Sequence, residues 1–329
     1  MLLQVKNLSI RFPGNAVDTV SGVGFEVEPG SITALVGESG CGKSISCLSL
    51  AGLLPVKPET GCALFTDRSG KTTDLLSLRE KQIRRFRGGE IAYIFQEPAS
   101  SLNPVLRIGE QIEEVLCLHR PDVKDYRAEV IRLLSEVGIP SPAERALAFP
   151  HELSGGMQQR VMIAMALAGN PSLLIADEPT TALDVTIQAQ ILEVIRQMTL
   201  QRGLGVILVT HNLGIVSNMA EQVVVMYAGQ ICESGPTRDI ISSPHHPYTK
   251  ALLQAVPRLG KRENALRGIP GRVPENNELP AGCRFCGRCA LCRSLPETAR
   301  KRCETASPPA TEVSAQHHVF CHYPNGITS

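Results

Sequence analysis

No segment limits the possible folds of this chain more than GESGCGKS, residues 37–44. It fits the spacing G-x-x-x-x-G-K-[ST], in which glycines let backbone N–H groups turn inward around phosphate oxygens. A buried strand within GSITALVGES precedes it, and a helix from about Lys43 to Leu54 follows it and stops at Pro55. The segment therefore predicts a phosphate loop, in which the helix N-terminus adds partial positive charge.

The residues of the phosphate loop have separate expected roles. Lys43 is expected to reach the β- and γ-phosphates of a nucleotide, and the Ser44 hydroxyl to coordinate Mg²⁺. Cys41 stands at a variable position, where an ordinary thiol is favoured over a redox role. The predicted nucleotide-binding residues of the loop are Gly37, Glu38, Ser39, Gly40, Cys41, Gly42, Lys43 and Ser44.

Two acids end another apolar strand, LLIADEP, at Asp177 and Glu178. The carboxyl end of a parallel strand faces the nucleotide crevice of such a sheet. Asp177 is therefore expected to hold Mg²⁺, directly or through water, and Glu178 to act as general base on the attacking water. Alone, the pair could equally cap a strand and begin a turn, but the phosphate loop favours the catalytic interpretation.

Strands and helices alternate through most of the chain. Residues 107–149 and 157–168 have helical spacing, residues 180–200 predict a long helix, and residues 223–235 predict a hairpin around Ala228 and Gly229. Apolar strands separated by helices indicate an α/β fold with a largely parallel sheet covered on both faces.

The order of further motifs is more specific than any of them alone. Gln96 follows the strand IAYIF, LSGGMQQR occupies residues 153–160 and opens a helix, TTALDV follows Glu178, and VILVTHN reaches His211. In this order the motifs resemble the ATP-binding cassette (ABC) ATPases over about residues 1–250. The resemblance implies a P-loop NTPase with a RecA-like core, an antiparallel β subdomain and a helical subdomain at about 97–160.

The resemblance also implies that two such domains dimerise head to tail around two ATP molecules. The motif LSGGMQQR would then contact the ATP held by the other subunit, through Ser154, Gly155, Gly156 and Gln158. A helix N-terminus that offers free N–H groups and a hydroxyl suits such an anion. Asp184 would cross the dimer interface.

Three other residues gain roles from the same resemblance. Gln96 would touch Mg²⁺ or the attacking water and sense the transport partner. His211 would contact the γ-phosphate and orient Glu178, so the expected catalytic set is Lys43, Gln96, Glu178 and His211. Phe12, 25 residues before Gly37, would stack on adenine, although ordinary strand packing is the alternative.

Two longer strings are similar to the oligopeptide/dipeptide importer ATPases: FQEPASSLNPVLRIGEQ, residues 95–111, and SSPHHPYTKALLQAVP, residues 242–257. The similarity implies a second, usually non-identical ATPase, two transmembrane permeases and an extracytoplasmic binding protein, and a peripheral place on the cytoplasmic face of the cell membrane. Import of nickel or another small solute, an ABC ATPase that works without a permease, and an exporter ATPase are the alternatives. For His245 and His246, a helix start is favoured over a metal site.

Composition excludes other classes of function. With 33 Lys and Arg against 32 Asp and Glu, the net charge of +1 gives no general attraction to nucleic acid. The first residues lack the basic and apolar regions of a signal peptide, and no stretch approaches the ~20 apolar residues of a membrane span. The expectation is a cytoplasmic protein that reaches a membrane only through partners.

The composition changes after Val256, where prolines punctuate a polar linker, and we expect an ATPase domain over 1–256 and a C-terminal extension over 257–329. Six of the 11 cysteines fall in this extension. Free thiols, Zn²⁺ and an iron–sulfur cluster are all compatible with their C-x2-C spacing. The importer resemblance implies a [4Fe–4S] cluster on Cys283, Cys289, Cys303 and Cys321, with Cys286 and Cys292 as extra thiols.

Overall fold

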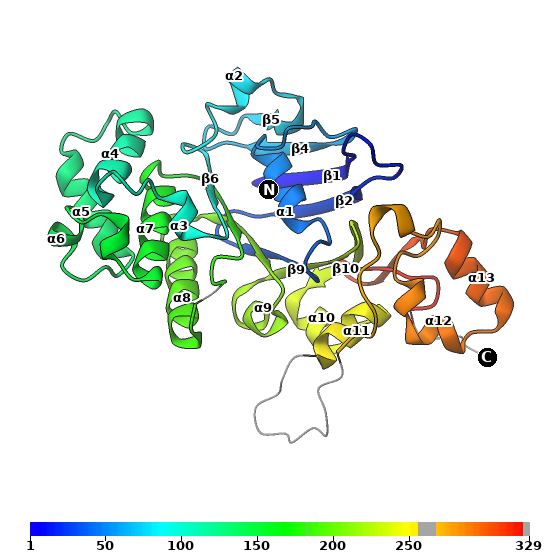
Figure 1. The fold of residues 1–329 in the computed structure, drawn as a ribbon. Coiled ribbons are helices and arrows are strands. Elements are labelled where there is room, and N and C mark those ends of the chain that lie inside the picture. Colours follow the sequence, from blue (N-terminus) through cyan, green and yellow to red (C-terminus); the bar gives the residue numbers. More distant parts are fainter. Residues whose placement is uncertain (182, 256–267, 325–329) are drawn as a thin grey trace. The chain divides into compact units, whose positions relative to one another are not determined.

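A computed structural model describes residues 1–181, 183–255 and 268–324 (Figure 1). The chain divides into two compact units, which are taken in turn. The first unit consists of residues Met1–Leu3, Val27–Ile32 and Leu64–Val209. The second unit consists of residues Gln4–Glu26, Thr33–Ala63 and Thr210–Ser329. Among the described residues, no helix is long and apolar enough to cross a membrane.

A parallel sheet forms the centre of the first unit. Its neighbouring strands are β6 (Ile91–Ile94), β7 (Leu173–Asp177) and β8 (Gly205–Thr210). The register pairs Ala176 with Ile94 on one side and with Leu208 on the other. All five residues of β7 are buried, as expected for a strand covered on both faces. Asp177, the last residue of β7, and Glu178 after it are therefore positioned by a buried strand.

Helices make up most of the rest of the first unit. Helix α7 (Gly155–Ala168) packs against β6 and against four other helices, which lie together with it in Figure 1. These four are α3 (Pro98–Ser101), α4 (Ile108–His119), α5 (Tyr126–Glu136) and α8 (Val185–Arg202). The first unit also contains the short strand β5 (Thr72–Asp74), which pairs antiparallel with the end of β4 (Thr60–Thr66). The turns η1 (Leu75–Ser77) and η2 (Pro150–Glu152) belong to it as well. The remaining helices are α2 (Glu80–Ile83) and α6 (Pro142–Arg145).

The second unit contains strand β3, which leads to the phosphate loop. Here β3 (Ile32–Val36) pairs parallel with β9 (Gln222–Tyr227), and β9 pairs antiparallel with β10 (Gln230–Pro236). Ala228 and Gly229 both have positive φ and close the predicted hairpin. The other elements before the tail are β1 (Leu3–Ile10), β2 (Val20–Val27), α1 (Lys43–Leu50), β4 (Thr60–Thr66), α9 (Leu213–Met219), α10 (Thr237–Ser242) and α11 (Pro247–Gln254).

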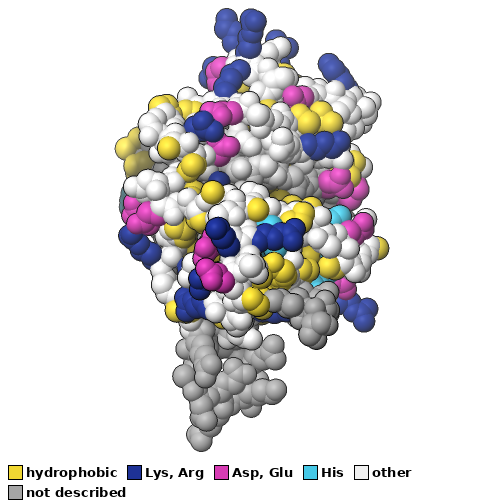
Figure 2. All heavy atoms as spheres, turned by 90° about the vertical axis from the view of Figure 1, so that its right-hand side faces the viewer, with side chains coloured by type: hydrophobic (Ala, Val, Ile, Leu, Met, Phe, Trp, Pro, Cys, Tyr) yellow, Lys and Arg dark blue, Asp and Glu magenta, His cyan; other side chains and the backbone are white. Residues whose placement is uncertain are grey.

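The tail, residues 268–324, belongs to the second unit and extends its sheet. Strand β12 (His317–Phe320) pairs antiparallel with β10 and with β11 (Ala310–Ser314). Figure 2 views the right-hand side of Figure 1, where α12 (Ala290–Ser294) and α13 (Glu297–Thr305) lie, and shows basic, acidic and apolar side chains interspersed there. The remaining tail elements are η3 (Asn276–Glu278) and η4 (Cys286–Arg288).

A buried carboxylate connects β10 to the tail. Glu233 is fully buried and accepts from the backbone N–H groups of His245 and His246, at 2.7 and 3.0 Å. One of its oxygens lies 2.8 Å from Nε2 of His317 on β12. His246 is the N-cap of α11, and its Nδ1 accepts from the N–H of Tyr248. The favoured helix-start interpretation of the two adjacent histidines is therefore confirmed for His246.

Two predicted helix boundaries are wrong. The long helix begins at Val185 instead of Thr180, because the Asp184 carboxylate caps it by accepting from Ile187 N–H at 3.0 Å. Helix α1 ends at Leu50 instead of Leu54, because Gly52 adopts φ +62° and its N–H turns back to the Ser49 carbonyl. The first residues of the predicted linker, 257–267, lie outside the described residues, as does Val256 before them.

Candidate active site

Glycines give the phosphate loop its shape. Gly42 precedes α1 with φ +93°, in the left-handed region. A side-chain Cβ at Gly37 would lie 2.1 Å from the Met226 carbonyl oxygen, so only glycine fits this passage beside β9. The loop is also tied to the β9–β10 turn, because Gly229 N–H donates to the Cys41 carbonyl at 2.9 Å. The backbone of the predicted phosphate loop is therefore determined by its immediate surroundings.

Lys43, the first residue of α1, is buried within the loop. Its Nζ donates to the carbonyl oxygens of Gly37 and Glu38 at 2.8 and 3.0 Å, and lies 3.6 Å from Cys41 Sγ. Burial raises the pKa of the Cys41 thiol, and the Lys43 charge only partly opposes this. The ammonium group is therefore held against the backbone of the loop.

The acidic strand end holds its two carboxylates differently. Asp177 is buried at the end of β7, and one oxygen accepts from the Tyr93 hydroxyl at 2.9 Å. Glu178 follows with φ +46°, an unfavourable conformation for a residue with a side chain. Its Oε2 accepts from Gln96 Nε2 at 3.2 Å and from Thr181 Oγ1 at 2.8 Å. Backbone strain of this kind is concentrated at functional sites.

The motif LSGGMQQR opens α7 as the sequence predicts. Ser154 is the N-cap and its hydroxyl accepts from Met157 N–H, while Gly155 and Gly156 form the first turn. Gln158 Nε2 donates to the carbonyls of Pro150 and Leu153, at 2.8 and 3.3 Å. A Cβ on Gly156 would lie 2.8 Å from the Ile187 side chain, so α7 approaches the first turn of α8 closely.

The structure brings some of the predicted site residues together. Gln96, Asp177 and Glu178 meet at the ends of β6 and β7 in the first unit. The phosphate loop belongs to the second unit, as do Phe12, which follows β1 and is half-buried, and His211, which follows β8 and is exposed. One carboxylate oxygen of Asp184 accepts from the Ile187 N–H and so caps helix α8.

Four residues of these surroundings are absent from the sequence-based predictions. Tyr93 and Thr181 contact the acidic pair, and Tyr248 and Arg288 contact the phosphate loop. Thr181 lies three residues after Glu178, and this short spacing is a sequence signal for a contact between them. Nothing in the sequence links Arg288 to a loop 250 positions away.

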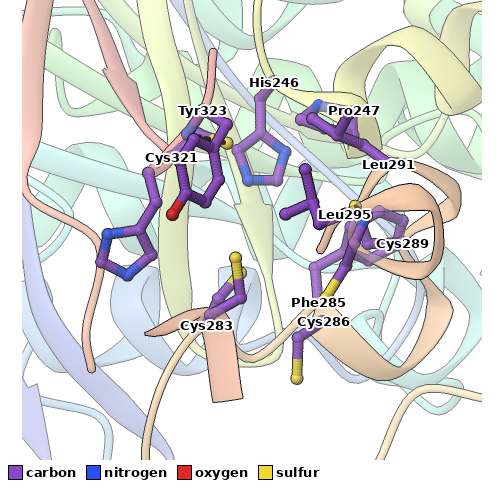
Figure 3. A pocket seen from close by; sticks show the side chains of 13 residues that line it. His246, Pro247, Cys283, Phe285, Cys286, Cys289, Leu291, Leu295, Cys321 and Tyr323 are labelled. Atoms are coloured by element: carbon purple, nitrogen blue, oxygen red, sulfur yellow. Dashed lines mark hydrogen bonds between the residues drawn. The ribbon is translucent and has the colours of Figure 1, made fainter. Parts of the chain in front are cut away.

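The cysteine cluster, named here for the six tail thiols, gathers around one pocket (Figure 3). Its members are Cys283, Cys286, Cys289, Cys292, Cys303 and Cys321. Figure 3 shows the Cys286 sulfur turned away from those of Cys283 and Cys321. Within the part of the chain that the structure describes, no group of three or more His, Cys, Asp or Glu side chains is placed to hold a metal ion.

Burial dominates the chemistry of these thiols. Burial and, to a smaller extent, the neighbouring thiols of the cluster raise the pKa of Cys283 and of Cys303 to about 12. His246 also lines the pocket, and burial lowers its pKa to about 3. Thiols with such values remain protonated near neutral pH unless a cation offsets the charge of the thiolates.

Comparisons with known proteins agree with these motifs. The family model described as "ABC transporter" matches residues 20–181, and the model "Oligopeptide/dipeptide transporter, C-terminal region" matches residues 232–295. A putative peptide import ATP-binding protein of Brucella ovis is 47% identical, with 97% of this chain and 96% of the relative covered. The dipeptide transport ATP-binding protein DppD of Escherichia coli is 43% identical, with coverages of 98% and 97%.

Solved structures give the same result for the fold. A dimeric ATP-binding cassette in a post-hydrolysis state with ADP and phosphate matches with a TM-score of 0.63 at 25% identity, over 72% of this chain and 99% of its own. A subunit of the ABC transporter complex cbiONQ from Clostridium perfringens matches with a TM-score of 0.62 at 26% identity, over 74% and 91%. The fold is thus that of an ABC ATPase cassette, with α/β architecture. The chain belongs to the ATP-binding proteins of the ABC transporter family, in the group that carries the oligopeptide/dipeptide transporter C-terminal region.

Proposed function

We infer that this chain is the ATP-hydrolysing subunit of a peptide importer. The observation that carries the inference is the relationship to peptide-import and dipeptide-transport ATP-binding proteins at 43–47% identity over 97–98% of the chain. That relationship includes both the cassette and the C-terminal region. The chain hydrolyses ATP to ADP and phosphate, and this reaction drives peptide import.

The phosphate loop is the proposed binding site for the ATP phosphates. The buried position of Lys43 inside the loop supports its role as a counter-charge to the β- and γ-phosphates. Ser44 and Asp177 are the proposed Mg²⁺ ligands, with Gln96 as a further one. When bound, Mg²⁺ would neutralise charge on the phosphate oxygens. Phe12 is proposed to stack on adenine.

Glu178 is the proposed general base. Its carboxylate would accept a proton from water while the water oxygen attacks the γ-phosphorus and the bond to the ADP oxygen breaks. The hydrogen bonds from Gln96 and Thr181 to one carboxylate oxygen support this role, because they orient the base. His211 is proposed to contact the γ-phosphate and to orient Glu178.

The residues at the start of α7 are proposed to complete the site of a second ATPase subunit. A serine hydroxyl that accepts one hydrogen bond, as Ser154 does, retains a hydrogen to donate to phosphate. Gly155, Gly156 and Gln158 would belong to the same contact, and Asp184 to the dimer interface. A Ser154→Arg subunit should still bind ATP in its own loop but fail to close on the ATP of its partner. Crosslinking across the dimer tests this, and a Ser154–phosphate contact within one monomer would contradict it.

The assembly and domain structure remain proposals. The partners are a second, non-identical ATPase, two permeases and, through the permeases, an extracytoplasmic peptide-binding protein. The chain would lie peripherally on the cytoplasmic face of the membrane. We propose two domains, the cassette over 1–256 and the Cys-rich extension over 257–329. The cassette would consist of a RecA-like core, an antiparallel β subdomain and a helical subdomain at about 97–160.

The cysteine cluster is the proposed site of a [4Fe–4S] group, with zinc as the alternative. Six cysteine thiols line one pocket, and thiolate sulfur is a preferred ligand both of iron–sulfur clusters and of zinc. The proposed ligands are Cys283, Cys289, Cys303 and Cys321, with Cys286 or Cys292 as substitutes. Because no three described donors are arranged for a metal, the sulfurs would have to shift on binding. The group would supply positive charge that offsets four thiolates and orders the tail.

Two experiments test the proposed function. Purified with its operon-encoded partners in proteoliposomes, the chain should hydrolyse ATP and drive uptake of a labelled dipeptide, with a nickel chelate as the competing solute. Uptake of the nickel chelate alone would favour the small-solute alternative. Affinity purification from membranes should recover permease subunits, whereas active ATPase recovered without any membrane protein would favour an ABC ATPase that works without a permease.

A further inference from the structure

An arginine of the tail contacts the phosphate loop. Arg288, at the end of the turn η4, points its guanidinium at Glu38, the second residue of the loop. The two N–O distances are 2.6 and 3.1 Å, so both guanidinium nitrogens engage the carboxylate. The Arg288 side chain is only 8% exposed, against 29% for Glu38. A two-pronged, largely buried ion pair is among the stronger polar contacts available to a protein.

The rest of the guanidinium is also bound. Its remaining hydrogen bonds go to the carbonyls of Pro270 and Ile269, at 2.9 and 3.0 Å, and to the Tyr227 hydroxyl at 3.3 Å. Burial alone would lower the pKa of Arg288, but the bonds to Glu38 and Tyr227 outweigh it and raise the pKa. Arg288 is therefore a fixed positive charge, positioned by the backbone of the tail.

Three contacts fix Glu38, and one of them is with Lys43, the proposed phosphate-binding lysine. Its carboxylate meets Arg288, its N–H donates to the Tyr248 hydroxyl at 2.9 Å, and its carbonyl accepts from Lys43 Nζ at 3.0 Å. Tyr248 and Tyr227 pack on Phe285 of the tail, with ring centroids 5.2 and 5.1 Å away. The conformation of the loop around Lys43 thus depends on tail residues.

Charge gives this contact a consequence for nucleotide binding. Glu38 places a carboxylate in a loop whose ligand carries several negative charges, and a like charge at short range disfavours the ligand. Arg288 offsets that carboxylate and prevents it from turning toward the phosphates. Resting on the function proposed above, we propose that Arg288 is a positioning residue of the ATP site, which acts on the phosphate loop through Glu38 and makes the tail a part of the nucleotide-binding apparatus.

The main test is a double-mutant cycle on the full-length chain. Binding of N-methylanthraniloyl-ATP with Mg²⁺ is measured by fluorescence for wild type, Arg288→Met, Glu38→Gln and the double variant. Arg288→Met should weaken binding by about tenfold, which is within the usual range for coupled sites. In the double variant, Glu38→Gln should restore most of the affinity that Arg288→Met loses, because the unpaired carboxylate is gone, and the single variant Glu38→Gln completes the cycle. A purely structural role of Arg288 predicts no such rescue.

Salt and a control variant sharpen the result. The loss in Arg288→Met should shrink between ~0.05 M and ~0.5 M salt, since screening weakens charge repulsion. Arg300→Met removes another tail ion pair, the exposed contact of Arg300 with Glu304 at 3.5 Å, and should leave binding unchanged. Thermal unfolding without nucleotide shows whether each variant is folded. If Arg288→Met does not fold, Arg288→Lys, which keeps the charge without the two-pronged geometry, replaces it and should lose a smaller part of the affinity.

The outcomes separate this inference from the proposed function. Lys43→Ala should weaken binding regardless of Arg288. If Lys43→Ala weakens binding while Arg288→Met binds as wild type does, or if the double variant is as weak as Arg288→Met, the role of Arg288 is wrong and the ATP site stands. If the wild-type chain does not bind the nucleotide analogue, the proposed function is wrong, and the role of Arg288, which rests on it, is wrong as well.

Discussion

The nucleotide motifs and the cysteine cluster differ in how far the protein arranges its functional atoms without a ligand. In the phosphate loop, Lys43 already lies against the carbonyls of Gly37 and Glu38, and glycines hold the backbone. Glu178 is likewise held by two hydrogen bonds. The six thiols of the cluster share a pocket, but among the described side chains they do not form a group ready for a metal ion.

The contrast follows from the charges involved. Backbone amides and a single lysine do not repel one another, so a site made of them can be complete in the folded chain. Thiols bind metals as thiolates, and two effects oppose the charged form here. Burial comes first and repulsion between neighbouring thiolates second, and both raise the pKa of Cys283 and Cys303. A thiolate site therefore reaches its final geometry only together with its cation.

The largest expected effect tests the preorganised region. Glu178→Gln keeps the shape of the side chain but cannot accept a proton from water, so hydrolysis should fall by ~10²–10⁴-fold while ATP binding persists. The measurement is steady-state phosphate release by the assembled transporter, beside nucleotide affinity. Glu193→Gln on the exposed face of α8 is the matched control and should keep nearly full activity. Wild-type hydrolysis by Glu178→Gln would show that another group is the base.

The next effect tests the cluster. Protein purified without oxygen should carry about four irons per chain and absorb broadly near ~400 nm. Cys321→Ser should lose the iron and lower the thermal stability of the tail, whereas Cys47→Ser, on a buried thiol of α1, should keep both. Iron analysis, absorption and limited proteolysis of the tail are the measurements. Colourless protein that carries one zinc per chain would show that zinc occupies the site instead of an iron–sulfur group, and that a metal still orders the tail. Protein with neither metal would contradict both the iron–sulfur group and the ordering of the tail by a metal.

The smallest effect separates two glycines of the same loop. Gly37→Ala would put a Cβ 2.1 Å from the Met226 carbonyl oxygen, and should cost about 3 kcal/mol of folding stability through overpacking. Gly40 has φ +78° but open space around it, so Gly40→Ala should cost only about 1 kcal/mol. Urea denaturation measures both. Equal losses of folding stability in the two variants would mean that the contact with the Met226 carbonyl does not restrict the loop at Gly37.

Most of the local structure of the candidate site was predictable from sequence. The phosphate loop, the acidic strand end, the helix that begins after Ser154 and the hairpin around Ala228 each depend on residues close together in the chain. Helix ends were less predictable: Asp184, predicted as an interface residue, also caps α8 and moves its start to Val185. A cap depends on which of several neighbouring side chains reaches the backbone, and helical periodicity does not show that.

By itself, the sequence determined the family and predicted the chemistry of the motifs, because glycine positions, strand-end acids and thiol spacing are local properties that can be read from the linear order of residues. Only the tertiary structure decided that Glu38 is paired with Arg288 and held by Tyr248, and that the tail supports the phosphate loop. The physical reason is distance along the chain. Contacts between residues separated by 250 and 210 positions depend on how buried strands and aromatic rings pack, and such packing leaves no periodic pattern in the sequence.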